Sequence, residues 1–143
     1  MIQFDTEILS VDGIPARLIH PLRADCGRTA VFYHGWSSSG GLQVTRAAVL
    51  AAHGYTVLLP DAVCHGARGT LPDYYSIGAY ESFWKAIFQN VREFPALSAF
   101  LASRGFANPW VLGHSMGGMT VLGIAAEYPD GIRGAGSFNG FGD

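Results

Sequence analysis

The segment from Trp110 to Glu127 constrains the fold more than any other part of this 143-residue chain. It starts with an apolar run, passes through Gly113-His114-Ser115-Met116-Gly117 and continues in residues typical of a helix. A Gly-X-Ser-X-Gly pattern between a strand and a small-residue helix predicts a sharp turn that presents the serine hydroxyl at the sheet edge. The two glycines leave room beside a serine held at strained backbone angles. A glycine-rich turn with a bystander serine is the alternative interpretation.

A serine in this turn is a candidate nucleophile. It lies at the start of a helix, where N–H groups and the helix dipole favour negative charge, and the N–H of Met116 is a candidate oxyanion donor. Such a serine needs a histidine as general base. The chain has five histidines, and none follows Ser115: His20, His34, His53, His65 and His114. We therefore expect the catalytic set to be incomplete within these 143 residues.

Composition narrows the class of protein. Hydrophobic residues make up 49% of the chain, which predicts one globular domain over residues 1–143, or the first part of one. A net charge of −2 gives no reason to expect a nucleic-acid or membrane partner. The spacing of Cys26 and Cys64 is not that of a metal or redox site. A disulfide between them is possible, but reduced thiols are the default expectation. With no signal peptide or long apolar run, we expect a cytoplasmic protein without metal or cofactor.

The pattern of apolar and turn residues predicts a hairpin followed by alternating strands and helices. This alternation indicates an α/β fold, with a mostly parallel sheet and helices on both faces. Asp12-Gly13 marks the turn of the N-terminal antiparallel hairpin. The clearest helix covers residues 79–94, and Pro95 is expected to kink or restart it before Gly105. The expected strands are 2–11, 14–20, 28–34, 55–59, 109–114 and 132–138, and the other helices are 41–52 and 116–128.

A second candidate site is His34-Gly35-Trp36, at the carboxyl end of a predicted strand, where ligands bind in open α/β sheets. The flexible Gly35 allows the N–H of Trp36 to face the same point as the N–H of Met116. Two such donors would form an oxyanion hole. In the alternative interpretation the segment is an ordinary strand-to-helix loop.

A third segment, Pro60-Asp61 through His65-Gly66 to Arg68-Gly69, follows the next strand at the same sheet edge. Together the three segments resemble the α/β-hydrolase superfamily, in particular its esterase branch related to dienelactone hydrolases and prolyl-oligopeptidase-like enzymes. The resemblance covers roughly residues 10–140. The serine turn is shared by the whole superfamily, whereas the Asp61, His65 and Arg68 pattern is narrower.

The resemblance implies that Ser115 is the nucleophile and that Trp36 and Met116 supply the oxyanion donors for a small acyl substrate. It places Asp61, His65 and Arg68 near the mouth of the pocket as loop-ordering residues; Arg68 could instead bind a substrate carboxylate or be solvated. His65 is also a candidate for substrate contact. The remaining candidates are His34, Gly35 and His114, and His114 could instead be a packing residue.

The chain departs from the family pattern after Ser115. Family members continue with strands that carry the acid and the histidine, in the order serine, acid, histidine. Here Asp143 is a candidate acid or an ordinary terminal aspartate, and no candidate histidine exists. We expect a C-terminally incomplete serine hydrolase that acts on carboxylic esters, nearly inactive as this chain and self-associating through its last strand. The alternatives are a non-catalytic binding module, an acyltransferase and a serine peptidase.

Overall fold

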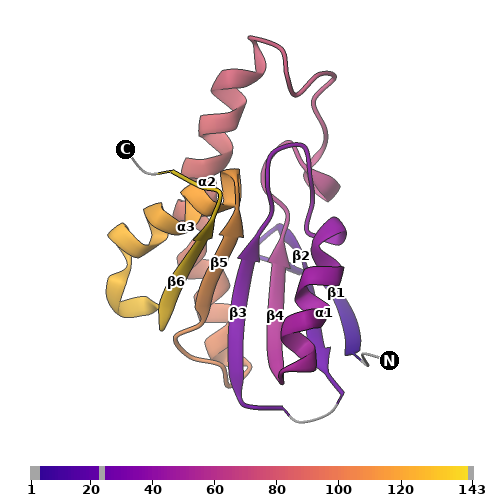
Figure 1. Cartoon of the computed structure of the whole chain (residues 1–143), viewed down its shortest axis with the longest axis vertical. Coiled ribbons are helices and arrows are strands. Elements are labelled where there is room, and N and C mark those ends of the chain that lie inside the picture. The colour runs from indigo at the N-terminus through magenta and orange to yellow at the C-terminus, as the bar shows by residue number, and fades with distance from the viewer. Residues whose placement is uncertain (1–3, 23–24, 142–143) are drawn as a thin grey trace.

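The computed structural model describes residues 4–22 and 25–141. An N-terminal hairpin is followed by strands and helices in alternation (Figure 1). The strands are β1 (Phe4–Val11), β2 (Ile14–Pro21), β3 (Arg28–Tyr33), β4 (Tyr55–Pro60), β5 (Trp110–His114) and β6 (Gly134–Phe138). The helices are α1 (Val44–Ala52), α2 (Ala79–Ser103) and α3 (Met116–Glu127), with short 3₁₀ turns at Gly41–Gln43, Gly66–Arg68 and Pro129–Gly131.

The six strands form one mixed sheet in the order β1-β2-β4-β3-β5-β6. The hairpin β1–β2 is antiparallel, with Asp12 and Gly13 both at positive φ in its turn, and β2 pairs antiparallel with β4. The remaining pairs, β4–β3, β3–β5 and β5–β6, are parallel. The predicted α/β fold with a mostly parallel sheet and an N-terminal hairpin is therefore confirmed. Parallel pairing brings the carboxyl ends of β3, β4 and β5 to one edge, the upper edge in Figure 1.

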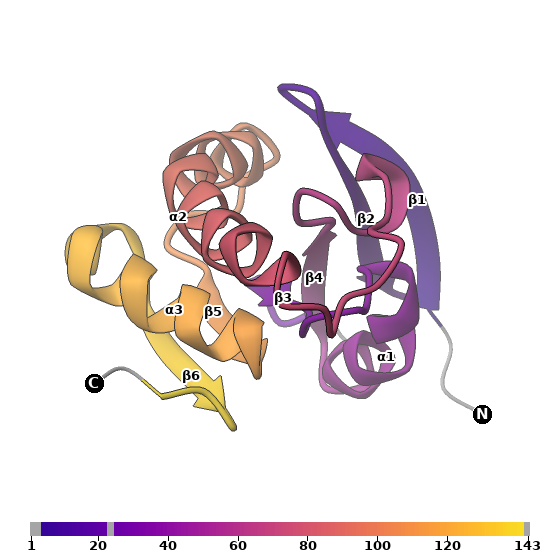
Figure 2. The same cartoon turned by 90° about the horizontal axis from the view of Figure 1, so that it is seen from above.

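Helices cover both faces of the sheet (Figure 2). Alternate residues of the central strands point to opposite sides. Val31 and Tyr33 of β3 pack in the core with Phe94 of α2 and Val121 of α3. Ala30 and Phe32 of the same strand instead join the core beneath α1.

Helix α2 differs in two ways from the helix that the sequence pattern predicts. Pro95 lies inside one continuous α2 rather than restarting it. Its apolar and polar faces also divide less cleanly than the sequence pattern suggests. Asn90, assigned to the polar face, is buried, while Tyr80 and Phe88, assigned to the apolar face, are 67% and 57% exposed. The reason is that α2 packs against α3 and the loop after β4, as well as the sheet, so that its buried surface is not a single straight stripe.

Candidate active site

Ser115 occupies the turn between β5, which ends at His114, and α3, which begins at Met116. Its backbone angles, φ 55° and ψ −117°, lie in a region that non-glycine residues rarely adopt. Two hydrogen bonds hold the turn: the Ser115 N–H donates to Phe138 O at 2.8 Å, and the Met119 N–H donates to Ser115 O at 3.1 Å. The strand-turn-helix geometry predicted from the sequence is present, and the side chain is only partly buried.

The glycines around Ser115 have a steric explanation. A Cβ on Gly113 would lie 2.2 Å from Gly117 O, and a Cβ on Gly117 would lie 2.2 Å from Tyr33 O. Both distances are far below van der Waals contact, so a side chain at either position would push β5, α3 and β3 apart. The close approach that the glycines permit brings the start of α3 against the end of β3.

The His34-Gly35-Trp36 segment lies directly beside the serine turn. A Cβ on Gly35 would be 3.3 Å from His114 O and 3.5 Å from Ser115 Cβ. Trp36 and Met116 belong to one apolar cluster on the α2 side of the sheet. The two residues predicted to supply oxyanion donors are thus neighbours of Ser115 and of each other. Convergence of their N–H groups on one point remains a prediction.

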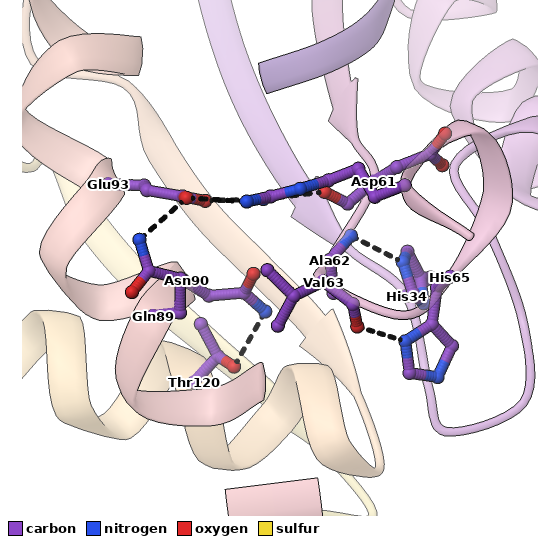
Figure 3. A network of polar contacts seen from close by, with 10 residues as sticks. His34, Asp61, Ala62, Val63, His65, Gln89, Asn90, Glu93 and Thr120 are labelled. Atoms are coloured by element: carbon purple, nitrogen blue, oxygen red, sulfur yellow. Dashed lines mark hydrogen bonds and ion pairs between the residues drawn. The ribbon is translucent and has the colours of Figure 1, made fainter. Parts of the chain in front are cut away.

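His34 and His65 are buried and hydrogen-bonded to the two loops that surround the site (Figure 3). Nε2 of His34 accepts from the Ala62 N–H at 3.0 Å, and its Nδ1 faces Gly35 O at 2.8 Å. Nε2 of His65 accepts from the Ser37 N–H at 3.2 Å, and its Nδ1 faces Val63 O at 2.8 Å. This pattern assigns the Nδ1–H tautomer to both rings, because Nε2 must be unprotonated to accept.

Both histidines are neutral at neutral pH. Burial lowers the pKa of His34 to about 4, outweighing the hydrogen bond to Gly35 O, which raises it. Burial also lowers the pKa of His65, against the opposing effect of the hydrogen bond to Val63 O. With every ring nitrogen engaged in the protein, the two side chains connect loops rather than face open solvent.

Asp61 and Arg68 hold the loop after β4. The Asp61 carboxylate accepts from the Gly40 N–H at 2.7 Å and from the Ala67 N–H at 2.9 Å. The guanidinium of Arg68 makes a bidentate ion pair with Glu93 of α2, at 2.8 and 2.9 Å, and also donates to Asp61 O at 3.3 Å. Of the three roles open for Arg68, this geometry favours loop ordering, since a solvated side chain or a free carboxylate receptor would not be paired in this way.

Three residues of this arrangement were not singled out from the sequence. Glu93 pairs with Arg68 and also accepts from Gln89 at 2.8 Å (Figure 3). Tyr74 accepts the Trp36 indole N–H at 2.7 Å on its backbone oxygen, and its hydroxyl donates to Cys64 O at 2.6 Å. Only their residue types are visible in the sequence, because the contacts of Glu93 with Arg68 and of Tyr74 with Trp36 and Cys64 join segments ten or more positions apart.

Two sequence candidates remain, His114 beside the serine turn and Asp143. The His114 ring is near Gly35, and its Nε2 is 3.3 Å from the Asn139 amide nitrogen. It also borders a hollow on the α1 face, with Leu112 and Phe138. Asp143, the candidate acid, lies outside the described residues. Within residues 4–22 and 25–141, no three His, Cys, Asp or Glu side chains are grouped as a metal site.

Comparison with known proteins decides the family. The model of the serine aminopeptidase S33 hydrolases matches residues 26–138, most of the chain. This chain belongs to that family. It is an esterase-like member of the α/β-hydrolase superfamily, as its motifs suggested. The match covers the serine turn, the Trp36 segment and the loop that carries Asp61, His65 and Arg68.

Individual relatives agree with this assignment. The chain is 36% identical over 106 residues to esterase YjfP of Escherichia coli, covering 69% of this chain and 40% of YjfP. It is 29% identical over 135 residues to YitV of Bacillus subtilis, covering 90% of this chain and 51% of YitV. A CIB-like hydrolase of Thermoplasma acidophilum superimposes with a TM-score of 0.63 at 20% identity, over 94% of this chain and 62% of that one, which supports the fold alone. The chain thus spans about half the length of these curated relatives, or less.

Helix length and polarity give one further fact. No helix within the described ranges combines the length and apolar character that crossing a bilayer requires.

Proposed function

We propose that Ser115 is the nucleophile of a serine hydrolase that cleaves carboxylic esters. The observation that carries the proposal is the strained Ser115 turn between β5 and α3, with Gly35 against the Ser115 side chain. In this proposal a histidine takes the hydroxyl proton, Ser115 Oγ attacks the carbonyl carbon, and the alcohol leaves with a proton from the same histidine. Water then hydrolyses the acyl-enzyme.

The N–H groups of Trp36 and Met116 stabilise the oxyanion in this proposal. Each lies in a segment that adjoins Ser115, and the Trp36 loop is held by hydrogen bonds from both sides. Prearranged donors of this kind are worth about 3–4 kcal/mol of transition-state stabilisation each. The general base in this proposal is a histidine other than His34 and His65, because both of those rings are hydrogen-bonded to the surrounding loops.

The family description also favours a second candidate, cleavage of an N-terminal peptide bond. An aminopeptidase must bind the substrate ammonium, and a carboxylate usually does so. The hollow beside Trp36 is lined by aromatic, aliphatic and serine side chains, without a carboxylate. This supports ester cleavage over aminopeptidase activity.

Paired substrates test the proposal. We expect the chain to hydrolyse p-nitrophenyl acetate slowly, well below about 1 s⁻¹, because loss of a triad member costs about 10⁴–10⁶ in turnover. Alanine p-nitroanilide should be cleaved more slowly still, and Ser115→Ala should abolish the ester activity. Preference for the anilide would support the peptidase, and an ester rate unchanged in Ser115→Ala would refute the nucleophile. Faster turnover lost in Ser115→Ala would point to a base within the chain.

A further inference from the structure

A hollow of about 430 Å³ opens beside the candidate oxyanion loop, between that loop and the start of α2. Its lining includes Trp36, Tyr75, Ile77, Tyr80 and Phe83. The size falls within the range of small-molecule pockets, which are typically apolar with a few polar groups. We call this hollow the aromatic pocket.

The wall formed by Trp36 is rigid. The indole N–H donates to Tyr74 O at 2.7 Å, which fixes the plane of the ring. The indole also makes edge-to-face contacts with Tyr74 and Phe83, at centroid distances of 5.1 and 5.3 Å. An aromatic ring held in this way can receive a second flat ring without first being ordered.

The opposite side of the pocket is formed by large apolar and aromatic side chains that are mostly exposed. Ile77 is 97% exposed, Tyr75 84% and Tyr80 67%, all within six positions of the chain. An exposed apolar patch next to a polar rim is typical of a binding site. No lysine, arginine, aspartate or glutamate lines the hollow, so it offers nothing to neutralise a charged group.

The position of Trp36 links the pocket to the reaction. Its backbone N–H is the proposed oxyanion donor, while its side chain is a wall of the pocket, and Phe83 shares an apolar cluster with Met116. Trp36 thus belongs both to the proposed oxyanion loop and to the wall of the pocket. We propose that the aromatic pocket binds a flat, neutral, apolar group of the ester that Ser115 attacks. This inference rests on the proposed function and adds the class of substrate.

Binding can be measured without catalysis, on Ser115→Ala, by NMR titration of the Trp36 indole N–H signal. The probes are ethyl benzoate, with the ring on the acyl side, phenyl acetate, with the ring on the alcohol side, and ethyl acetate, which has no ring. We expect at least one aromatic ester to shift the signal, and the stronger of the two identifies the end of the ester that enters the pocket. Ethyl acetate should have little effect, and so should a fourth probe, the benzoate anion, because no lysine or arginine lines the pocket.

Tyr80→Ala should weaken aromatic-ester binding by about three- to tenfold, the range typical of one aromatic contact. Phe88→Ala, an exposed aromatic on the same helix outside the pocket, should leave it unchanged. Ile77→Ala provides a second test at a position with almost no packing to lose. Equal shifts with ethyl acetate, or equal binding in Tyr80→Ala and Ile77→Ala, would overturn the inference. Because Ser115 is absent, such a failure leaves the proposed function standing, and the hydrolysis assay judges that separately.

Discussion

The Ser37 N–H donates a hydrogen bond to Nε2 of His65, 28 positions further along the chain. The His65 ring also packs edge-on against the Trp36 indole, with ring centroids 4.8 Å apart. One side chain thus fixes both the residue that carries the proposed oxyanion donor and the residue after it. His65 is in this account a positioning residue, which acts through the loop and does not touch the substrate.

Replacing His65 should therefore slow the chemistry through the loop. We expect His65→Ala to lower the rate of Ser115 acylation by p-nitrophenyl acetate by about tenfold or more, approaching the loss of an oxyanion donor. The amide signal of Ser37 should move and exchange faster with solvent in the same variant. His53→Ala, at an exposed histidine, is the matched control and should change neither. An unchanged Ser37 amide together with an unchanged rate would remove His65 from the account.

Because His34 is buried and neutral, we expect the fold to lose stability at acid pH. Its pKa is about 4 in the fold and 6.5 in the unfolded chain, so the unfolded state binds the extra proton first. Its contribution to the free energy of unfolding is complete above pH 6.5 and is lost as pH falls from there to about 4, a difference of about 3 kcal/mol. Urea unfolding across this range should show a weaker pH dependence in His34→Gln than in the unchanged chain. An equal pH dependence of the unfolding free energy in the two proteins would contradict a lowered pKa for His34.

Compared with the exposed ion pair between Arg104 and Glu7, the ion pair between Arg68 and Glu93 should contribute more to the free energy of unfolding. Both side chains are more than four-fifths buried, so Arg68→Ala leaves a carboxylate poorly solvated and should destabilise the fold by about 2–4 kcal/mol. Arg104→Ala removes an exposed pair with Glu7 that solvent screens, so it should cost much less stability than Arg68→Ala. Chemical denaturation of the two variants side by side measures the contrast. Similar losses would mean that the buried pair does not anchor the loop.

The glycine after the serine turn should resist even a small side chain. Gly117→Ala puts a Cβ into Tyr33 O and should cost at least about 3 kcal/mol or prevent folding. Gly78→Ala is the control, since the nearest atom there is 4.0 Å away. Thermal unfolding of both variants tests this, and a Gly117→Ala protein as stable as the control would show that the packing described here is wrong.

The free edge of β6 is expected to self-associate. In the described part of the sheet, β6 pairs with β5 alone, and unpaired strand edges are templates for association. Phe138 on this strand is 52% exposed. Phe138→Lys should reduce association in sedimentation experiments, while Ile8→Lys on the opposite edge strand should not. A monomer at about 100 µM that unfolds cooperatively above about 60 °C, near the top of the mesophile range, would contradict this expectation.

Sequence reasoning recovered the parts of the molecule that depend on local patterns. The Ser115 turn, the hairpin at Asp12-Gly13 and the alternation of strands and helices each follow from neighbouring residues. It failed on α2, where Asn90 is buried against Thr120 at 3.4 Å, because a polar residue can be internal when a distant partner is present.

The loop network shows the same limit. Asp61, His65 and Arg68 were recognised as a group, but their partners could not be named. Glu93 and the amides of Gly40 and Ser37 lie far from them in sequence, so only the fold reveals these hydrogen bonds.

Detection of the acyl-enzyme tests the central claim most directly. We assign no general base among residues 1–143, so we expect slow acylation by p-nitrophenyl acetate, slower hydrolysis of the product and accumulation of an acetyl group on Ser115. Peptide mass spectrometry locates the modified residue, with the urea-unfolded chain as the measure of background reactivity. The account predicts acetylation of Ser115 above that background in the folded protein and its absence in Ser115→Ala. Acetylation of Ser115 no faster than in the unfolded chain would contradict it.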